Sequence, residues 1–128
     1  MTDSAAATDP LRVLLVDPDD RVRESLAGLL CIGQRCVVIG SAGTADGALL
    51  LASETAPDVV VIDPRLPGVD GADLIARFRV AAPTSRVLVL NWSETADLAS
   101  GADAYARKTF RPHELIDAVV ATTRRSHA

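Results

Sequence analysis

The sequence predicts an α/β domain in which a five-stranded parallel sheet carries helices on both faces. Two patterns predict it: short apolar runs typical of strands covered on both faces, and a segment of helical period after each run. Because parallel strands need right-handed helical crossovers, five such units in series give a doubly wound sheet. The expected strands are residues 11–16, 36–39, 59–62, 87–90 and 104–106, and the expected helices are residues 19–30, 44–55, 71–80, 93–100 and 112–124.

The first two units are recognised by their apolar runs and by residues that favour helix starts. The run over residues 11–16 ends at Asp17, and helical spacing begins soon after it. Asp19 is expected in the first turn of that helix, where an acidic side chain complements the helix dipole. The second helix follows the next apolar run, with Thr44 as its expected N-cap.

The remaining units show the same alternation. Residues 59–62 are the most β-branched run of the chain and end at Asp63. The link that follows contains two prolines and a glycine, so we expect it to be irregular. The next strand ends at Asn91, and Pro112 suits the first position of the last helix.

Length and composition limit the classes of protein. With 128 residues the chain is long enough for one domain, expected over residues 11–124 with a flexible lead at 1–10 and a polar tail at 125–128. A net charge of −4 and 3% aromatic residues argue against a nucleic-acid partner. No apolar run reaches the length of a membrane helix, and the first residues do not resemble a secretory signal. We therefore expect a cytoplasmic protein, with Cys31 and Cys36 as free thiols.

Polar residues directly after the strands are the candidate functional groups. In open parallel sheets the crevice lies at the carboxyl ends of the strands, and Asp17, Asp63, Asn91 and Lys108 all fall there. An aspartate at a strand end is often only a turn residue, but compatible groups after three strands favour a site. Two carboxylates suit Mg²⁺, and a carboxylate beside a cation can attack a phosphoryl donor. Lys108 would then pair with the phosphate as a point charge.

Three segments carry a resemblance to a known family. LRVLLVDPDDRVRESLAGLL, PDVVVIDPRLPGVDGADLIARF and GADAYARKTFRPHELIDAV resemble the receiver domain of two-component response regulators, from residue 11 to about residue 122. The resemblance implies a flavodoxin-like (βα)₅ domain that accepts a phosphoryl group on Asp63 from a histidine kinase or a phosphotransfer protein. It also implies a Mg²⁺ ion held by Asp17, Asp63 and the backbone carbonyl of Arg65. Lys108 and Asn91 would contact the phosphoryl group, and Asn91 and Tyr105 would act as switch residues.

The sequence departs from the family pattern close to this site. Pro18 stands where the family has a second acidic residue, so we expect weak Mg²⁺ binding. Asn91 replaces the usual serine or threonine. Trp92 follows where the family prefers a small residue, and it is either a shield over Asp63 or an indole packed on a shortened helix. These changes are typical of an atypical receiver.

Three functions compete at this stage. The first is a stand-alone receiver of a phosphorelay, signalling through protein contacts as a monomer or as a weak homodimer through the last helix and fifth strand. Its only chemistry would be self-catalysed phosphoryl transfer and autodephosphorylation. The alternative is a degenerate receiver that binds proteins independently of phosphorylation. An enzyme on a similar fold is disfavoured. A flavin carrier does not fit because the loop DPDDR would repel phosphate. An aspartate phosphatase does not fit because, although Asp17 and Asp19 show its spacing, its remaining motifs match poorly.

Overall fold

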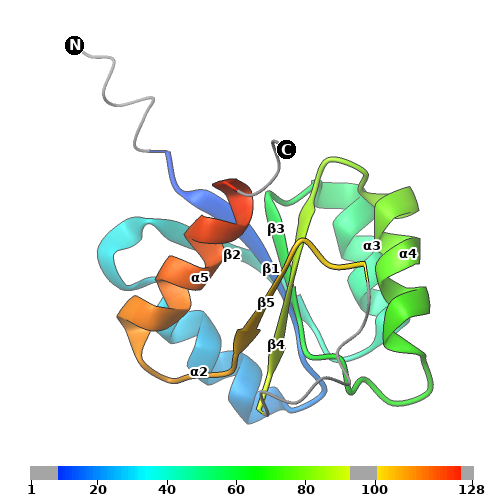
Figure 1. The fold of residues 1–128 in the computed structure, drawn as a ribbon, viewed down its shortest axis with the longest axis horizontal. Coiled ribbons are helices and arrows are strands. Elements are labelled where there is room, and N and C mark those ends of the chain that lie inside the picture. The colour runs from blue at the N-terminus through cyan, green and yellow to red at the C-terminus, as the bar shows by residue number, and fades with distance from the viewer. Residues whose placement is uncertain (1–8, 93–100, 125–128) are drawn as a thin grey trace.

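The computed structural model describes residues 9–92 and 101–124, and they form a three-layer α/β domain (Figure 1). The strands are β1 (Leu11–Val16), β2 (Cys36–Ala42), β3 (Val59–Ile62), β4 (Arg86–Asn91) and β5 (Ala104–Arg107). The helices are α2 (Asp20–Leu30), α3 (Ala45–Thr55), α4 (Gly71–Ala81) and α5 (Pro112–Arg124), with a short 3₁₀ turn, η1 (Ile32–Gln34). All strand pairs are parallel, in the order β2-β1-β3-β4-β5, which confirms the predicted fold class.

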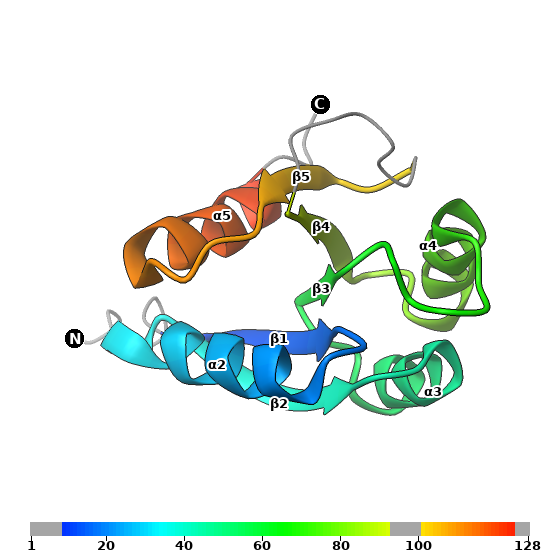
Figure 2. The same cartoon turned by 90° about the horizontal axis from the view of Figure 1, so that it is seen from below.

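The two helical layers cover opposite faces of the sheet. Helices α2 and α5 lie on one side, and α3 and α4 lie on the other (Figure 2). Successive residues of a strand point to opposite faces, so in β3 Val61 packs toward α2 and α5 while Val60 packs toward α3 and α4. Every residue of β3 is buried, which is why its sequence is apolar without alternation.

The helix starts are fixed by side-chain caps. Thr44 accepts a hydrogen bond from the Gly47 N–H at the start of α3, as the sequence predicts. Asp70 caps α4 in the same way. Asp19 lies one residue before α2 rather than in its first turn, and its carboxylate accepts from the N–H groups of the second and third residues that follow it. It therefore satisfies helix donors that would otherwise lack a partner.

Strand β2 is longer than predicted. It continues to Ala42 because the second half of β1 pairs with Gly40, Ser41 and Ala42 after an irregularity in the register. Glycine has a low strand propensity, so the sequence pattern ends the strand before Gly40, whereas pairing with β1 extends it. The predicted helix over residues 93–100, the lead and the tail lie outside the described residues, except for residues 9 and 10 of the lead.

The sequence predicts two free cysteine thiols and no membrane-spanning helix. Cys31 is exposed and Cys36 is buried, and both are free. None of the helices in the described ranges has the length and apolar character needed to cross a membrane.

The strand order has a topological switch point between β1 and β3. From β1 the chain runs outward to β2 and then returns to β3 on the other side of β1. The links that leave β1 and β3 therefore diverge to opposite faces, which leaves a crevice at the carboxyl ends of these two strands. Residues that directly follow β1 and β3 line this crevice.

Candidate functional site

Three charged residues that are distant in sequence meet at the carboxyl edge of the sheet. Asp17, Asp63 and Lys108 each come directly after a strand, and each N–H still bonds to the neighbouring strand. The Asp17 N–H donates to the carbonyl of Ala42 (3.1 Å), and the Asp63 N–H donates to that of Val16 (2.9 Å). The Lys108 N–H donates to the carbonyl at the end of β4 (2.6 Å). The rigid sheet therefore fixes where the three side chains start.

The ammonium group of Lys108 bridges the two carboxylates. Its Nζ donates to Asp17 Oδ2 and, at 2.6 Å, to Asp63 Oδ2. The side chains of all three residues are at most 4% exposed. Buried charges are tolerated when they are paired and hydrogen-bonded, so the lysine is what allows two carboxylates to lie together in the interior.

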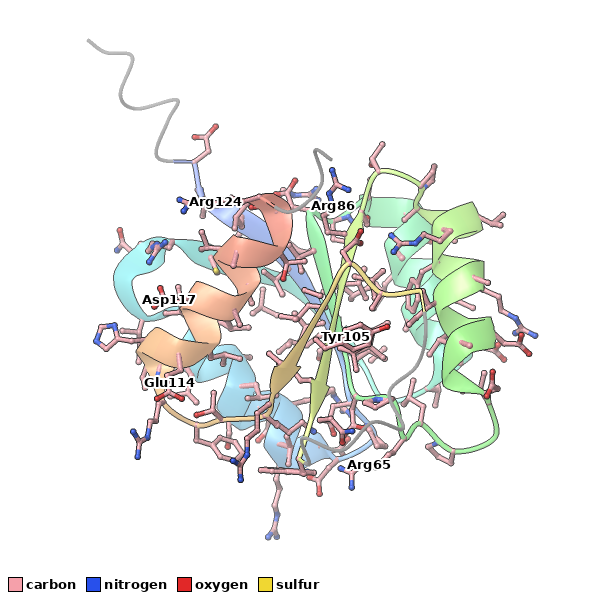
Figure 3. All side chains as sticks on the ribbon, in the orientation of Figure 1. Arg65, Arg86, Tyr105, Glu114, Asp117 and Arg124 are labelled. Carbon is pink, nitrogen blue, oxygen red and sulfur yellow. The ribbon has the colours of Figure 1, made fainter. Side chains whose placement is uncertain are left out.

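Arg65 is a fourth member of the site, and it binds Asp63 from the solvent side. Its backbone N–H donates to Asp63 Oδ1 (2.8 Å), its Nε to Oδ1 (3.2 Å) and its Nη2 to Oδ2 (3.0 Å). The Arg65 side chain is 58% exposed. Figure 3 shows it at the edge where the strands end. The sequence reasoning assigned only the backbone carbonyl of Arg65 and missed its guanidinium group.

A repeated local motif explains how both aspartates are oriented. Asp17-Pro18-Asp19 and Asp63-Pro64-Arg65 each begin with Asp-Pro, and in each the carboxylate accepts from the N–H two residues later. Asp side chains commonly form this Asx-turn, and the intervening proline pre-sets its own φ and has no N–H to compete. The motif is a sequence signal that could have placed Arg65 beside Asp63.

Asp63 is held in its charged form. Burial would raise the pKa of the carboxyl group, but hydrogen bonds from the side chain and backbone of Arg65 and from Lys108 outweigh it and hold the pKa below its ordinary value. The same contact raises the pKa of the Arg65 guanidinium. At neutral pH Asp63 is therefore a carboxylate with positive charge on two sides.

The site opens into a pocket of about 440 Å³. The described residues that line it are Asp17, Pro18, Asp19, Val22, Asp63, Arg65, Trp92 and Lys108. The Trp92 ring lies with its centroid 5.0 Å from the Lys108 ammonium, a cation–π contact, and 5.6 Å from the ring of Phe110. Trp92 is 41% exposed and forms one wall of the pocket. Whether it shields Asp63 from a donor stays a prediction.

The two expected switch residues are not among the described residues that line the pocket. Asn91 is half-buried at the end of β4, and its carbonyl accepts the Lys108 N–H. Tyr105 is 42% exposed. Figure 3 shows it on β5, well apart from Arg65. Asn91 is thus linked to the site through the backbone, and Tyr105 through its strand.

The residues present do not fit a divalent cation in this arrangement. All four carboxylate oxygens of Asp17 and Asp63 already accept hydrogen bonds, from Lys108, Arg65 and the Asp19 N–H. Two positive side chains balance the two negative ones. Within residues 9–92 and 101–124 no cluster of three or more His, Cys, Asp or Glu side chains could hold a metal. The expected weakness of Mg²⁺ binding stays a prediction, and it has a structural basis here.

Comparison with known proteins identifies the family. The model of the response regulator receiver domain matches residues 13–120. The chain belongs to this family. A similar protein is the DNA-binding response regulator MtrA of Mycolicibacterium smegmatis, 37% identical over 121 residues, which cover 90% of this chain and 51% of MtrA. The uncharacterized transcriptional regulatory protein YxjL of Bacillus subtilis is 31% identical over 91% of this chain and 56% of its own length.

Solved structures agree with this assignment. The signal receiver domain of the putative response regulator NarL from Mycobacterium tuberculosis superposes with a TM-score of 0.81 at 27% identity, covering 91% of this chain and 98% of that one. A LuxR-family response regulator from Aurantimonas gives a TM-score of 0.80 at 31% identity, over 90% and 86% of the two chains. The chain spans about half the length of the curated relatives it matches.

Membership in the family sets the general class of function. A receiver domain is a phosphoacceptor signalling module of a two-component system, not a classical enzyme, and it typically works with a histidine kinase. Receiver domains generally bind Mg²⁺. In this receiver Arg65 and Lys108 both pair with the Asp63 carboxylate.

Proposed function

We propose that Asp63 accepts a phosphoryl group from a histidine kinase or phosphotransfer protein, and that the modified domain signals through protein contacts. The observation that carries the proposal is an ionised carboxylate at the end of β3, bound by the Lys108 ammonium at 2.6 Å and lining an open pocket. A carboxylate so placed is a nucleophile with a positive charge beside the position of the incoming group.

The proposed transfer exchanges one bond to phosphorus for another. An Asp63 carboxylate oxygen bonds to phosphorus as the P–N bond to the donor imidazole breaks. The ring nitrogen keeps the electron pair, and the ring leaves as neutral imidazole once it has taken a proton from water. Lys108 and Arg65 contribute positive charge where negative charge spreads over the transferring oxygens. The product is an aspartyl phosphate on Asp63.

The signal would start from the negative charge that phosphorylation adds to the site. A phosphoryl group brings about −1.5 to −2 charges, so the Lys108 ammonium would no longer pair with the carboxylates of Asp17 and Asp63 in the same way. Lys108 is bonded through its backbone to Asn91 and directly follows β5. Its movement would therefore reach Asn91 and Tyr105, the expected switch residues, and the surface formed by β5 and α5.

A second candidate is a module that binds its partner without phosphorylation. It is favoured by the occupied carboxylate oxygens, by Pro18 at the position of a usual acid, and by Trp92 at the wall of the pocket. In this reading the ion-paired site is a structural element that keeps the receiver in one conformation.

Phosphorylation with a small donor separates the two candidates. Folded protein is incubated with phosphoramidate, with and without Mg²⁺, and intact mass is followed over time. We expect wild type to gain the mass of one phosphoryl group and Asp63→Asn to gain none. Asp73→Asn, which changes an exposed carboxylate on α4, is the matched control and should behave as wild type. Folded wild type that stays unmodified in both buffers would leave the binding module as the function.

A further inference from the structure

The side chain of Arg65 pairs with Asp63 from the solvent side of the site. We infer that the Arg65 guanidinium is a built-in replacement for a divalent cation, so that Arg65 and a divalent cation compete for Asp63. The inference about binding rests on geometry alone, and its consequence for phosphoryl transfer rests on the proposed function. It concerns the side chain of Arg65, whereas the family resemblance concerns only its backbone carbonyl.

The charged side chains that meet at the pocket balance one another. Asp17 and Asp63 carry two negative charges, and Lys108 and Arg65 carry two positive charges in direct contact with them. A divalent cation added to this set would face two cations and two carboxylates whose oxygens all accept hydrogen bonds. Each Asp63 oxygen accepts two hydrogen bonds, all of them from Arg65 and Lys108, and these use its acceptor sites. Binding of a divalent cation to Asp63 therefore requires that one of the positive side chains moves away.

Arg65 can move away from the site more easily than Lys108. The Lys108 side chain is 1% exposed, and it bridges both carboxylates. Displacing it would leave a buried charge without a partner, which is costly. The Arg65 side chain is 58% exposed and can turn into solvent, where its charge stays hydrated. Arg65 is therefore the group that a divalent cation must displace.

Residues 18–20 do not add a third carboxylate to hold a cation in the described part of the chain. Pro18 supplies none, and Asp19 is held in place as the N-cap of α2, with its Oδ1 atom at 2.9 Å and 3.1 Å from two backbone nitrogens. Asp20 is 81% exposed and paired with Arg23 at 2.5 Å. No group of three or more acidic, His or Cys side chains within the described residues could hold a metal. Of the two carboxylates of Asp17 and Asp63, that of Asp63 is held by the Arg65 fork at both oxygens.

The consequence for the proposed transfer is independence from divalent cations. The bond changes are those given above, and Arg65 supplies the second positive charge for the transferring group alongside Lys108. A guanidinium fork suits this role because it presents several N–H donors in a plane and stays protonated.

Metal binding tests the competition directly. Trp92 is the only tryptophan of the chain and lines the pocket, so its fluorescence reports on the site. Mn²⁺ binding is measured by this fluorescence and by the electron paramagnetic resonance of free Mn²⁺. We expect Arg65→Ala to bind Mn²⁺ about tenfold tighter than wild type, the effect of removing a charge-assisted contact. Arg65→Lys, which keeps the charge without the fork, should lie between them.

The matched control is Arg77→Ala. It removes one positive charge from an exposed position on α4 and should leave Mn²⁺ affinity within about twofold of wild type. Equal affinity in wild type and Arg65→Ala would overturn the inference. Equal tightening in Arg65→Ala and Arg77→Ala would also overturn it, because net charge alone would then explain the change.

Phosphorylation rates separate this inference from the proposed function. With phosphoramidate, wild type should be modified at rates within about twofold in EDTA and in Mg²⁺, whereas Arg65→Ala should be slow in EDTA and recover with Mg²⁺. Wild type that is modified only with Mg²⁺ would overturn the inference and leave the proposed function standing. No modification of any variant, together with tighter Mn²⁺ binding by Arg65→Ala, would overturn the proposed function and leave the competition standing.

Discussion

At the scale of single residues, the site is a balance between burial and pairing. Asp63 is 2% exposed, and burial alone would favour its neutral form. Its contacts with Arg65 and Lys108 reverse that preference, so the folded protein binds the Asp63 proton more weakly than the unfolded chain does. Asp63 therefore links the stability of the fold to pH.

The sign of this linkage gives a testable pH dependence. Because the pKa of Asp63 is lowered on folding, its contribution to stability is fully present above the ordinary aspartate pKa, about 4, and is lost as the pH falls through the folded value. We expect wild type to lose free energy of unfolding below about pH 4 faster than Asp63→Asn does.

Urea unfolding over a pH series, followed by circular dichroism, measures the difference. Asp73→Asn is the control, because that carboxylate is exposed on α4 and its removal should leave the acid limb of the curve as in wild type. Parallel acid limbs for wild type and Asp63→Asn would contradict the linkage.

Some contacts of the site could be predicted from the sequence, and one could not. The meeting of Asp17, Asp63 and Lys108 could be predicted because parallel strands end at one edge of the sheet. The contact of Arg65 with Asp63 could not be predicted in the same way, because it depends on the conformation of a side chain that is 58% exposed. Only the Asp-Pro turn before Arg65 pointed toward it.

At the scale of elements, strand ends and helix caps determine which groups reach the pocket. Helix α2 begins beside the site, and Asp19 is its N-cap. A carboxylate at this position could either cap the helix or bind a cation. The structure assigns the carboxylate to capping, while its backbone N–H donates to Asp17 Oδ1. An alanine at this position keeps that N–H and loses only the cap.

Asp19→Ala should therefore reduce stability without changing cation affinity. We expect a loss of about 1 kcal/mol in the free energy of unfolding, typical of a lost N-cap, with Mn²⁺ binding within about twofold of wild type. Asp19→Asn is the control, since an asparagine side chain caps well and removes the charge. Urea unfolding and Mn²⁺ titration of the same samples suffice. A large fall in Mn²⁺ affinity in both variants would make Asp19 a ligand.

Some elements of the fold could be predicted from the sequence more closely than others. The buried strands β1, β3 and β4 were predicted to within one residue at each end, because their apolar runs are short, rich in valine and leucine, and bounded by polar residues. Strand β2 was predicted too short, since Gly40 and Ser41 are held in it by their partners on β1 rather than by their own propensity. Pairing between elements is a tertiary effect that local patterns do not contain.

At the scale of the whole molecule, the strand order sets how a change at the site can spread. Lys108 spans Asp17 and Asp63, follows β5 and donates through its backbone to Asn91 at the end of β4. Strand β2 and helix α3 lie at the opposite edge of the sheet, beyond β1. A displacement of Lys108 should thus be felt mainly in β4, β5 and α5.

Hydrogen–deuterium exchange can test this directional spread. After modification with phosphoramidate, we expect changed exchange in β5 and near Lys108, with α3 and the outer residues of β2 as before, because three strands, β1, β3 and β4, lie between β2 and β5. Asp63→Asn treated in the same way is the control and should show no change. Under the proposed function, a response in β5 would place this strand in the surface that a partner contacts. Equal changes in α3 and β5 would mean that the domain responds as one body, and Lys108 would then not be the origin of the signal.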